Sequence, residues 1–319
     1  MTPHGLPSEL YHCLLDEQPH YLTPAWLLRN EELPGTVVVN PSCWFAWEGP
    51  LSPAMAARID FSDDFYATER IAWVEDPGTL AIWPFWVGDE YFEYLSRMTP
   101  GMVMEDDLPA HVRWVLTEAN ILVEPDHLGQ KRSAWRSRSL AYAKAFENGY
   151  VSVPGLIHPF HVGAMRRYYR CRTRKGSYLL GDEQVRRRFA AHNEEIARFI
   201  HAQLTHAISD VSGAVLRPSY AYFVSYLSGA VLEEHVDREQ CDYSITACID
   251  ASPEPVDESP WPIKLGTGED QVAIYQRLGD ALLYRGCQVA HSRDRLPEGF
   301  TSTSLLLHYV DAAFDGSLH

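Results

Sequence analysis

Three residues in the C-terminal half of the chain have the types and the spacing of a metal site. His235-Val236-Asp237 places two ligand-type side chains at positions i and i+2, and His291 follows some fifty residues later. Alternate residues of an extended strand point the same way, so His235 and Asp237 are predicted to share a face while Val236 faces away. Two imidazoles and one carboxylate hold one face of Fe(II) and leave the opposite face open. The pattern therefore predicts a mononuclear iron site.

The segments that would position these ligands are predicted to be strands. Runs of apolar and aromatic residues at 220–227 and 243–249 flank the His235 segment, and a Gly-Asp turn and an apolar run precede His291. Tyr150–Val153 is predicted as the first strand of this region and 304–310 as the last.

Three helices are predicted upstream of the metal ligands, and the strongest prediction runs from Asp182 to Ile208. Its apolar residues recur at helical spacing, and Asp182 is a suitable N-cap. The other two are expected over 131–149, with Asn148-Gly149 as its end, and from His158 through Tyr169.

The segment from about Tyr150 to Asp311 resembles the Fe(II)/2-oxoglutarate-dependent dioxygenases, nearest to their prolyl-4-hydroxylase-like branch. The matching residues are Tyr226-x-x-Gly229-x-x-Leu232-x-x-His235-x-Asp237, the run Gly279–Tyr284, and His291. The resemblance implies a double-stranded β-helix, or jelly-roll, with His235, Asp237 and His291 as both metal ligands and catalytic residues. It also implies Fe(II), 2-oxoglutarate as co-substrate, and O₂.

The implied reaction is oxidation of a small-molecule or peptide substrate. Relatives that halogenate lack the carboxylate ligand, so Asp237 favours hydroxylation or desaturation over halogenation.

The chain departs from the family pattern where 2-oxoglutarate should be held. The family usually places an Arg or Lys about one strand beyond the distal histidine, but residues 299–305 contain neither. A buried dicarboxylate without a cation is costly, so another donor is expected. Arg293, which by alternation faces the same way as His291, is the first candidate, and Lys264 is the second. Further hydroxyl donors are expected from three residues, Tyr226, Thr301 and Thr303.

Two other functions stay open at this point. The domain could be a barrel that has lost co-substrate binding and acts as a metal-binding or scaffold protein, which the missing distal cation favours. It could also be a cupin-like iron enzyme that uses no keto acid. The H-x-D…H pattern could itself be accidental, because histidines and acids are common.

The charge distribution predicts two domains. The net charge of the 319 residues is −16. Residues 1–130 contain 21 acidic residues against five arginines, whereas the remainder is neutral. We therefore predict an acidic accessory domain of mixed α/β structure over 1–130, with helices at 90–98 and 108–119, and an oxygenase jelly-roll domain over 131–319. The fold class is α+β.

Composition also limits the partners. The acidic segment disfavours binding to a nucleic-acid backbone and is compatible with a cationic or amine-bearing substrate. No apolar run approaches the ~20 residues that span a bilayer, and the N-terminus lacks the features of a secretory signal. The six cysteines form no C-x-x-C pair and are interpreted as reduced thiols. We expect a cytoplasmic protein that binds neither nucleic acid nor membranes.

Overall fold

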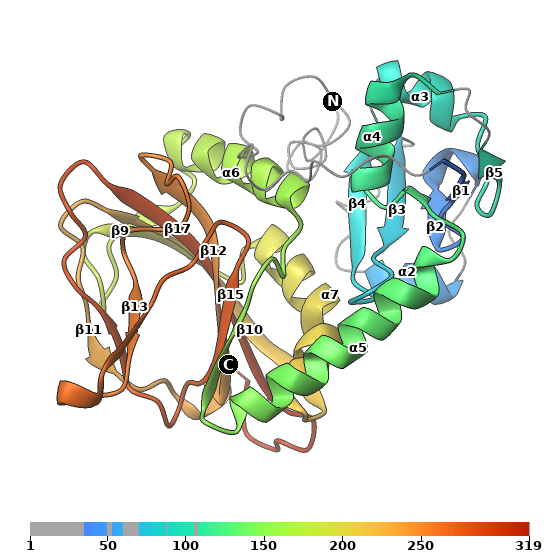
Figure 1. The fold of residues 1–319 in the computed structure, drawn as a ribbon. Coiled ribbons are helices and arrows are strands. Elements are labelled where there is room, and N and C mark those ends of the chain that lie inside the picture. Colours follow the sequence, from blue (N-terminus) through green and yellow to red (C-terminus); the bar gives the residue numbers. More distant parts are fainter. Residues whose placement is uncertain (1–34, 50–52, 60–69, 88, 105–107, 319) are drawn as a thin grey trace. The chain divides into compact units, whose positions relative to one another are not determined.

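A computed structural model describes residues 35–318 except 50–52, 60–69, 88 and 105–107 (Figure 1). The chain divides into two compact units. Unit 1 contains the residues up to Arg138 together with Gly163–Tyr168, and unit 2 contains Ser139–Val162 and the chain from Tyr169 onward. The predicted boundary at residue 130 falls within a helix, α5 (His127–Phe146).

Unit 1 contains two small antiparallel sheets. One has the order β5 (Val103–Met104), β1 (Val37–Val39), β6 (Leu122–Val123), and the other has the order β2 (Cys43–Phe45), β3 (Ile71–Glu75), β4 (Ile82–Trp86). Asn40 joins them, because its side-chain amide donates to the carbonyl oxygens of Glu75 (3.2 Å) and Asn120 (3.0 Å). The helices of this unit are α2 (Pro53–Ile59), α3 (Asp89–Leu95) and α4 (Ala110–Glu118), and a 3₁₀ turn, η3, covers Ala46–Glu48. The two helices predicted over 90–98 and 108–119 are confirmed as α3 and α4.

Unit 2 contains two larger antiparallel sheets, and they carry the predicted metal ligands. The seven-stranded sheet has the order β7-β15-β12-β17-β10-β9-β8. Its strands are β7 (Tyr150–Val153), β8 (Leu179–Leu180), β9 (Arg188–His192), β10 (Leu216–Leu227), β12 (Tyr243–Ser252), β15 (Ala281–Arg285) and β17 (Thr301–Asp311). The four-stranded sheet has the order β11 (Leu232–His235), β16 (His291–Arg293), β13 (Ile263–Leu265), β14 (Val272–Ile274). Figure 1 shows β11 and β13 across from β9 and β17, so that the two sheets enclose a common interior.

Two clusters of buried apolar side chains lie between the sheets. Tyr226, Trp261 and Leu232 belong to one, and Ile263, Leu282 and Tyr284 belong to the other. Each cluster takes residues from both sheets. Burial of apolar side chains from facing sheets is the main stabilising contribution in such a sandwich.

Helix α7 (Glu195–Ser212) packs against β10 and β17. The hydroxyl of Tyr309 on β17 donates to the carbonyl oxygen of His201 (2.8 Å), and Nε2 of His201 lies 2.7 Å from the carbonyl oxygen of His308. Parts of α5 and of α6 (Pro159–Arg174) also belong to this unit, and two 3₁₀ turns, η5 (Glu239–Cys241) and η6 (Gly268–Asp270), lie in loops. The strand predicted at 150–153 and the helices predicted over 131–149 and from His158 are confirmed.

The helix predicted from Asp182 to Ile208 is wrong over its first half. Residues 188–192 form strand β9, which pairs with β10, and α7 begins only at Glu195. Asn193 lies between the two elements and has a positive φ of 49°. Its side-chain oxygen accepts a hydrogen bond from the amide of Ala221 (3.0 Å). Pairing with a neighbouring strand thus overrides the helical preference of the Arg- and Ala-rich run, as tertiary context commonly does. The predicted cap is also wrong, because Glu194 accepts the Ala197 amide (3.0 Å) at the start of α7.

Three further observations concern the fold class, membrane-spanning helices and the cysteines. The structure is mixed α+β with antiparallel sheets, as expected. None of the helices in the described part of the chain combines the length and the apolar character needed to cross a bilayer. Five cysteines are present as free thiols, and Cys13 lies outside the described residues.

Candidate metal centre

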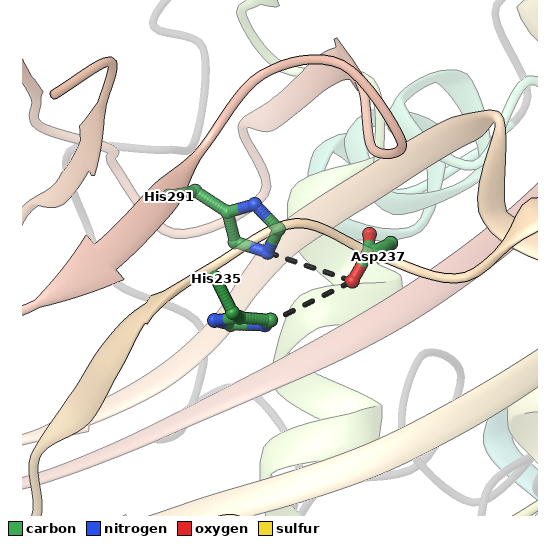
Figure 2. Close-up of side chains that lie close together, drawn as sticks. All are labelled: His235, Asp237 and His291. Atoms are coloured by element: carbon green, nitrogen blue, oxygen red, sulfur yellow. Dashed lines mark ion pairs between the residues drawn. The ribbon is translucent and has the colours of Figure 1, made fainter.

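The structure brings together His235 and His291 from two neighbouring strands and Asp237 from the segment that follows the first of them (Figure 2). His235 is the last residue of β11, and its backbone is in register with His291, the first residue of β16. The Nε2 atoms of His235 and His291 lie 3.8 and 3.6 Å from Oδ1 of Asp237. The two imidazole rings are 4.2 Å apart between centroids. The i, i+2 spacing therefore places its two side chains as the extended geometry predicts.

The Nδ1 contacts of both imidazoles assign the lone pair of each ring to Nε2. Nδ1 of His235 lies 2.8 Å from the carbonyl oxygen of Glu233, and Nδ1 of His291 lies 3.1 Å from that of Val289. A carbonyl oxygen can only accept, so each Nδ1 carries the proton and each Nε2 keeps its lone pair. Burial lowers the pKa of His291, which favours its neutral form. A neutral imidazole with a free Nε2 is the form that ligates a metal.

The carboxylate of Asp237 is held at its other oxygen. Ser244 Oγ, from β12, donates to Oδ2 (2.7 Å), and the Asp237 amide donates to the carbonyl oxygen of Gly286 (2.8 Å). Ser244 Oγ also lies 2.9 Å from Nδ1 of His308. These contacts direct Oδ1 toward the two imidazoles. Asp237 thus offers one oxygen to a metal while the second is engaged.

The donor set fits a divalent metal with open coordination positions. The three ligand atoms all lie within 4.8 Å of one another. An ion about 2.1 Å from ligand atoms at right angles requires them to be about 3 Å apart, so small side-chain adjustments suffice. Gln184 Nε2 lies 2.8 Å from His235 Nε2 and donates to it. This hydrogen bond uses the lone pair that a metal requires, so metal binding and the Gln184 contact exclude each other.

A second group of potential ligands shares Asp237 with the first. Asp237, Cys241 and His308 also offer ligand atoms within 4.8 Å of one another. However, burial raises the pKa of Cys241 to about 12, whereas a metal binds the thiolate. Cys241 Sγ is also 2.7 Å from the Tyr220 hydroxyl, and Ser244 joins Asp237 to His308. Hydrogen bonds satisfy this group without an ion, so we assign the metal site to His235, Asp237 and His291.

The site opens into a pocket of about 700 Å³ between the two sheets of unit 2. The three ligands line this pocket, together with two of the residues predicted to hold 2-oxoglutarate, Arg293 and Tyr226. Arg293 is 5% exposed, donates one N–H to the carbonyl oxygen of Trp261 (2.6 Å) and lies over the Trp261 ring (4.6 Å). It forms no ion pair with any carboxylate of the described residues. A buried cation without a counter-charge in the wall of a pocket is expected to bind an anion.

The other three predicted donors do not line the pocket. Lys264 pairs with Asp294 (2.5 Å between Nζ and Oδ2). Thr303 Oγ1 contacts Ser225 Oγ (2.9 Å), and Thr301 lies opposite Leu227 at the end of β17. The structure therefore separates Lys264, Thr301 and Thr303 from the candidate metal site, whereas it brings Arg293 and Tyr226 to it.

Arg188 is a pocket residue that the sequence did not single out. Arg188 is 6% exposed on β9, and its backbone is in register with Tyr226. Its Nη1 donates a hydrogen bond to the Tyr226 hydroxyl (3.2 Å). Arg188 also donates to Asp182 Oδ2 (2.6 Å) and to Gln184 Oε1 (3.0 Å). The guanidinium thus ties the segment 182–188, and through Gln184 the ligand His235, to the pocket wall. The helix predicted from Asp182 to Ile208 includes Arg188, so the prediction does not place its side chain in the pocket. The alternation of Arg188, Ala190 and His192 along one strand face was the available signal.

The pair of Asp182 and Arg188 should make stability depend on pH. Burial alone raises the pKa of Asp182, but hydrogen bonds from Arg188 and from the amides of Val185 and Gln184 outweigh it, and the pKa is lowered. A carboxyl with a lower pKa in the folded state stabilises the fold above its unfolded pKa of about 3.9, and this contribution is lost as the pH falls through the folded pKa. We expect urea unfolding to give a constant stability difference between wild type and Asp182→Asn at about pH 6 to 8, and a shrinking one below about pH 4. A difference independent of pH would contradict this interpretation of the pair.

Comparisons with known proteins found similarity only among solved structures. No family model matches the chain, and no curated protein matches it. The epimerase SnoN from nogalamycin biosynthesis, described as a non-heme alpha ketoglutarate dependent enzyme, is 13% identical and has a TM-score of 0.47, over 55% of this chain and 82% of its own. A Pseudomonas putida prolyl-4-hydroxylase is 13% identical with a TM-score of 0.44, over 55% and 100% of the two chains. A prolyl hydroxylase from Trichoplax adhaerens is 12% identical with a TM-score of 0.47, over 59% and 94%.

Proposed function

We propose that the protein is an Fe(II)- and 2-oxoglutarate-dependent oxygenase that hydroxylates or desaturates a small molecule or peptide. The supporting observation is the placement of a 2-His-1-carboxylate set and an uncompensated buried arginine in the wall of one pocket. The sheet order of unit 2 is compatible with the double-stranded β-helix that the sequence predicts. This proposal rests on the geometry of the site and not on the distant similarities.

Each residue has a distinct role in the proposed site. His235, Asp237 and His291 would hold Fe(II), which supplies oxidising chemistry when it binds a keto acid and O₂. The guanidinium of Arg293 would bind the far carboxylate of 2-oxoglutarate, with the Tyr226 hydroxyl as a further donor. One carboxylate of the co-substrate would then bind the metal ion, and the other would pair with the arginine. Ser244 would keep Asp237 oriented by one oxygen.

The pocket wall is also suited to exclude water from the reaction. Residues of both apolar clusters line the pocket that contains the metal ligands, and His291 is only 3% exposed. Electrostatic interactions strengthen where water is excluded, so the arginine and the metal would bind the anionic co-substrate more strongly than they would on the surface.

The test is anaerobic addition of Fe(II) and 2-oxoglutarate to the full chain. We expect a weak visible charge-transfer band and, once O₂ is admitted, conversion of 2-oxoglutarate to succinate. Both should be absent from His235→Ala and Asp237→Ala, because each variant lacks a ligand. His206→Ala is the matched control, since His206 lies on α7 beside Asp210 and outside the pocket lining. A band that persists in His235→Ala, or no band in wild type, would overturn the proposal.

A further inference from the structure

A continuous aromatic wall lies beside the candidate metal site. His192 on β9, Tyr220 and Tyr222 on β10, and His308 on β17 all line the pocket. The ring centroids are 4.9 Å apart for His192 and Tyr222, 5.8 Å for Tyr220 and Tyr222, and 4.7 Å for Tyr220 and His308. Through Ser244, His308 is hydrogen-bonded to the Asp237 carboxylate oxygen that faces away from the imidazoles. The wall therefore extends to the residues that would hold the metal.

An exposed cation stands at the same end of the pocket. Arg238 follows Asp237 directly, lines the pocket and has its guanidinium carbon 6.0 Å from the Tyr220 ring centroid. Within the described part of the chain it makes no ion pair. A guanidinium carries its charge at any physiological pH. Unlike Arg188, this guanidinium is not neutralised by a carboxylate.

The pocket is also lined by exposed apolar side chains and by two acids. Leu179 is 82% exposed and Val236 is 51% exposed, and both line the pocket. Asp182 and Glu183 also line it, and Asp182 is paired with Arg188. Among these charged residues, Arg238 is the one beside both the aromatic wall and a metal ligand. The side of the pocket nearest the reacting centre is therefore aromatic and positively charged.

We propose, on the basis of the function proposed above, that the substrate is a small molecule with a flat conjugated ring and an anionic group. The ring would stack on His192, Tyr220 and Tyr222, and Arg238 would pair with the anion. Stacking on aromatic side chains and pairing with a guanidinium are the interactions that this wall offers. A pocket of about 700 Å³ that must also hold a keto acid leaves room for a ligand of drug size.

This inference reverses the expectation drawn from net charge. The acidic N-terminal segment is compatible with an amine-bearing substrate, but the charge next to the aromatic wall is that of an arginine. Local charge within a pocket determines ligand preference more directly than charge elsewhere in the chain, because exposed charges beyond about 10 Å are screened by salt.

The test compares three ligands of one shape and different charge: indole-3-acetate, indole-3-acetamide and tryptamine. Binding to the protein with Fe(II) and 2-oxoglutarate is measured anaerobically by isothermal titration calorimetry. We expect the acid to bind about fivefold more tightly than the amide, the range for an exposed ion pair, and tryptamine to bind most weakly. Cyclohexylacetate, which has the charge without the flat ring, should bind more weakly than indole-3-acetate.

Variants assign the preference to residues. Arg238→Gln should equalise the affinities for acid and amide, and Tyr222→Leu should weaken binding of all three indoles. Arg186→Gln is the matched control, because Arg186 is exposed on the segment before β9 and does not line the pocket. Tightest binding of tryptamine, an unchanged acid-to-amide ratio in Arg238→Gln, or no binding of any indole would overturn the inference. The charge-transfer band is measured on the same samples, so its absence would overturn the oxygenase proposal separately.

Discussion

Replacing Arg293 with methionine should weaken 2-oxoglutarate binding at least about 30-fold without destabilising the fold. Arg293 is buried, and within the described residues its guanidinium contacts the Trp261 carbonyl oxygen and the face of the Trp261 ring and pairs with no carboxylate. Burying a cation without a counter-charge costs several kcal/mol, so the folded protein is less stable with this arginine than with an apolar side chain of similar length. The charge of this guanidinium therefore requires an anion as its partner. In the proposed function, that anion is the far carboxylate of 2-oxoglutarate.

The expected magnitudes separate the two effects. Loss of one partner of a buried charge pair costs about 2 to 5 kcal/mol of binding energy, so the dissociation constant for 2-oxoglutarate should rise by at least about 30-fold. The free energy of unfolding without ligand should stay within about 1 kcal/mol of wild type, or increase, because the lone cation is removed. Calorimetric titration with 2-oxoglutarate and urea unfolding measure the two quantities. Metal affinity should not change, because Arg293 is not a ligand.

Two comparison variants make this prediction specific. Arg188→Met removes a guanidinium that is paired with Asp182, so it should lower the free energy of unfolding, whereas Arg293→Met should not. Lys264→Met tests the other sequence-based candidate, whose ammonium pairs with Asp294 outside the pocket lining. If Lys264→Met loses 2-oxoglutarate while Arg293→Met binds it normally, the assignment of the distal carboxylate is wrong.

The metal ligands could be identified from the sequence because their geometry is local. The i, i+2 spacing of His235 and Asp237 determines their relative direction as soon as the segment is extended, and only one long-range contact is needed to add His291. The structure provides that contact as the register of β11 with β16. Arg293 was found for the same reason, since it lies two residues beyond His291 on one strand.

Residues positioned by long-range pairing could not be identified in this way. Arg188 enters the pocket because β9 pairs with β10, and the Arg- and Ala-rich composition of this run favours a helix despite the alternation of Arg188, Ala190 and His192. Lys264 lies on β13, and its partner Asp294, thirty residues away, determines where the ammonium is held. The residues around Lys264 alone could not predict the position of this side chain.

Gly286 is a residue of the site that only coordinates reveal, and its replacement by alanine should weaken metal binding at least about tenfold. A Cβ at this position would overlap the carbonyl oxygen of Cys241 and would lie 2.5 Å from both Asp237 Oδ2 and Ser244 Oγ. The Gly286 carbonyl oxygen accepts the Asp237 amide (2.8 Å), and the Gly286 amide donates to the Asp242 carbonyl oxygen (3.1 Å). These two hydrogen bonds join the backbone at Gly286 to the backbone of residues 237–242. The two segments cannot move apart without breaking them.

Asp237 would have to move in the alanine variant. Its carboxylate is a side chain, whereas the Cys241 carbonyl belongs to the backbone, so rotation of Asp237 is the cheaper adjustment. Rotation moves Oδ1 away from the Nε2 atoms of His235 and His291, which lie 3.8 and 3.6 Å from it. A displacement of about 1 Å is enough to impair a site of this kind. The remaining overlap with Cys241 should cost about 1 to 3 kcal/mol of stability, as overpacking usually does.

The experiment measures Ni(II) or Mn(II) affinity by calorimetry alongside urea unfolding. Gly286→Ala should bind either metal at least about tenfold more weakly than wild type, although all three ligands are present. Gly129→Ala is the matched control, because nothing lies within 4 Å of the added Cβ and α5 should gain a few tenths of a kcal/mol from alanine. In the double variant Gly286→Ala/Ser244→Ala one of the three overlaps is removed, and affinity should recover only in part, since the Cys241 carbonyl remains in place. If Gly286→Ala bound metal as wild type does, Asp237 would not be the carboxylate ligand, and the proposed 2-His-1-carboxylate site would have to be abandoned.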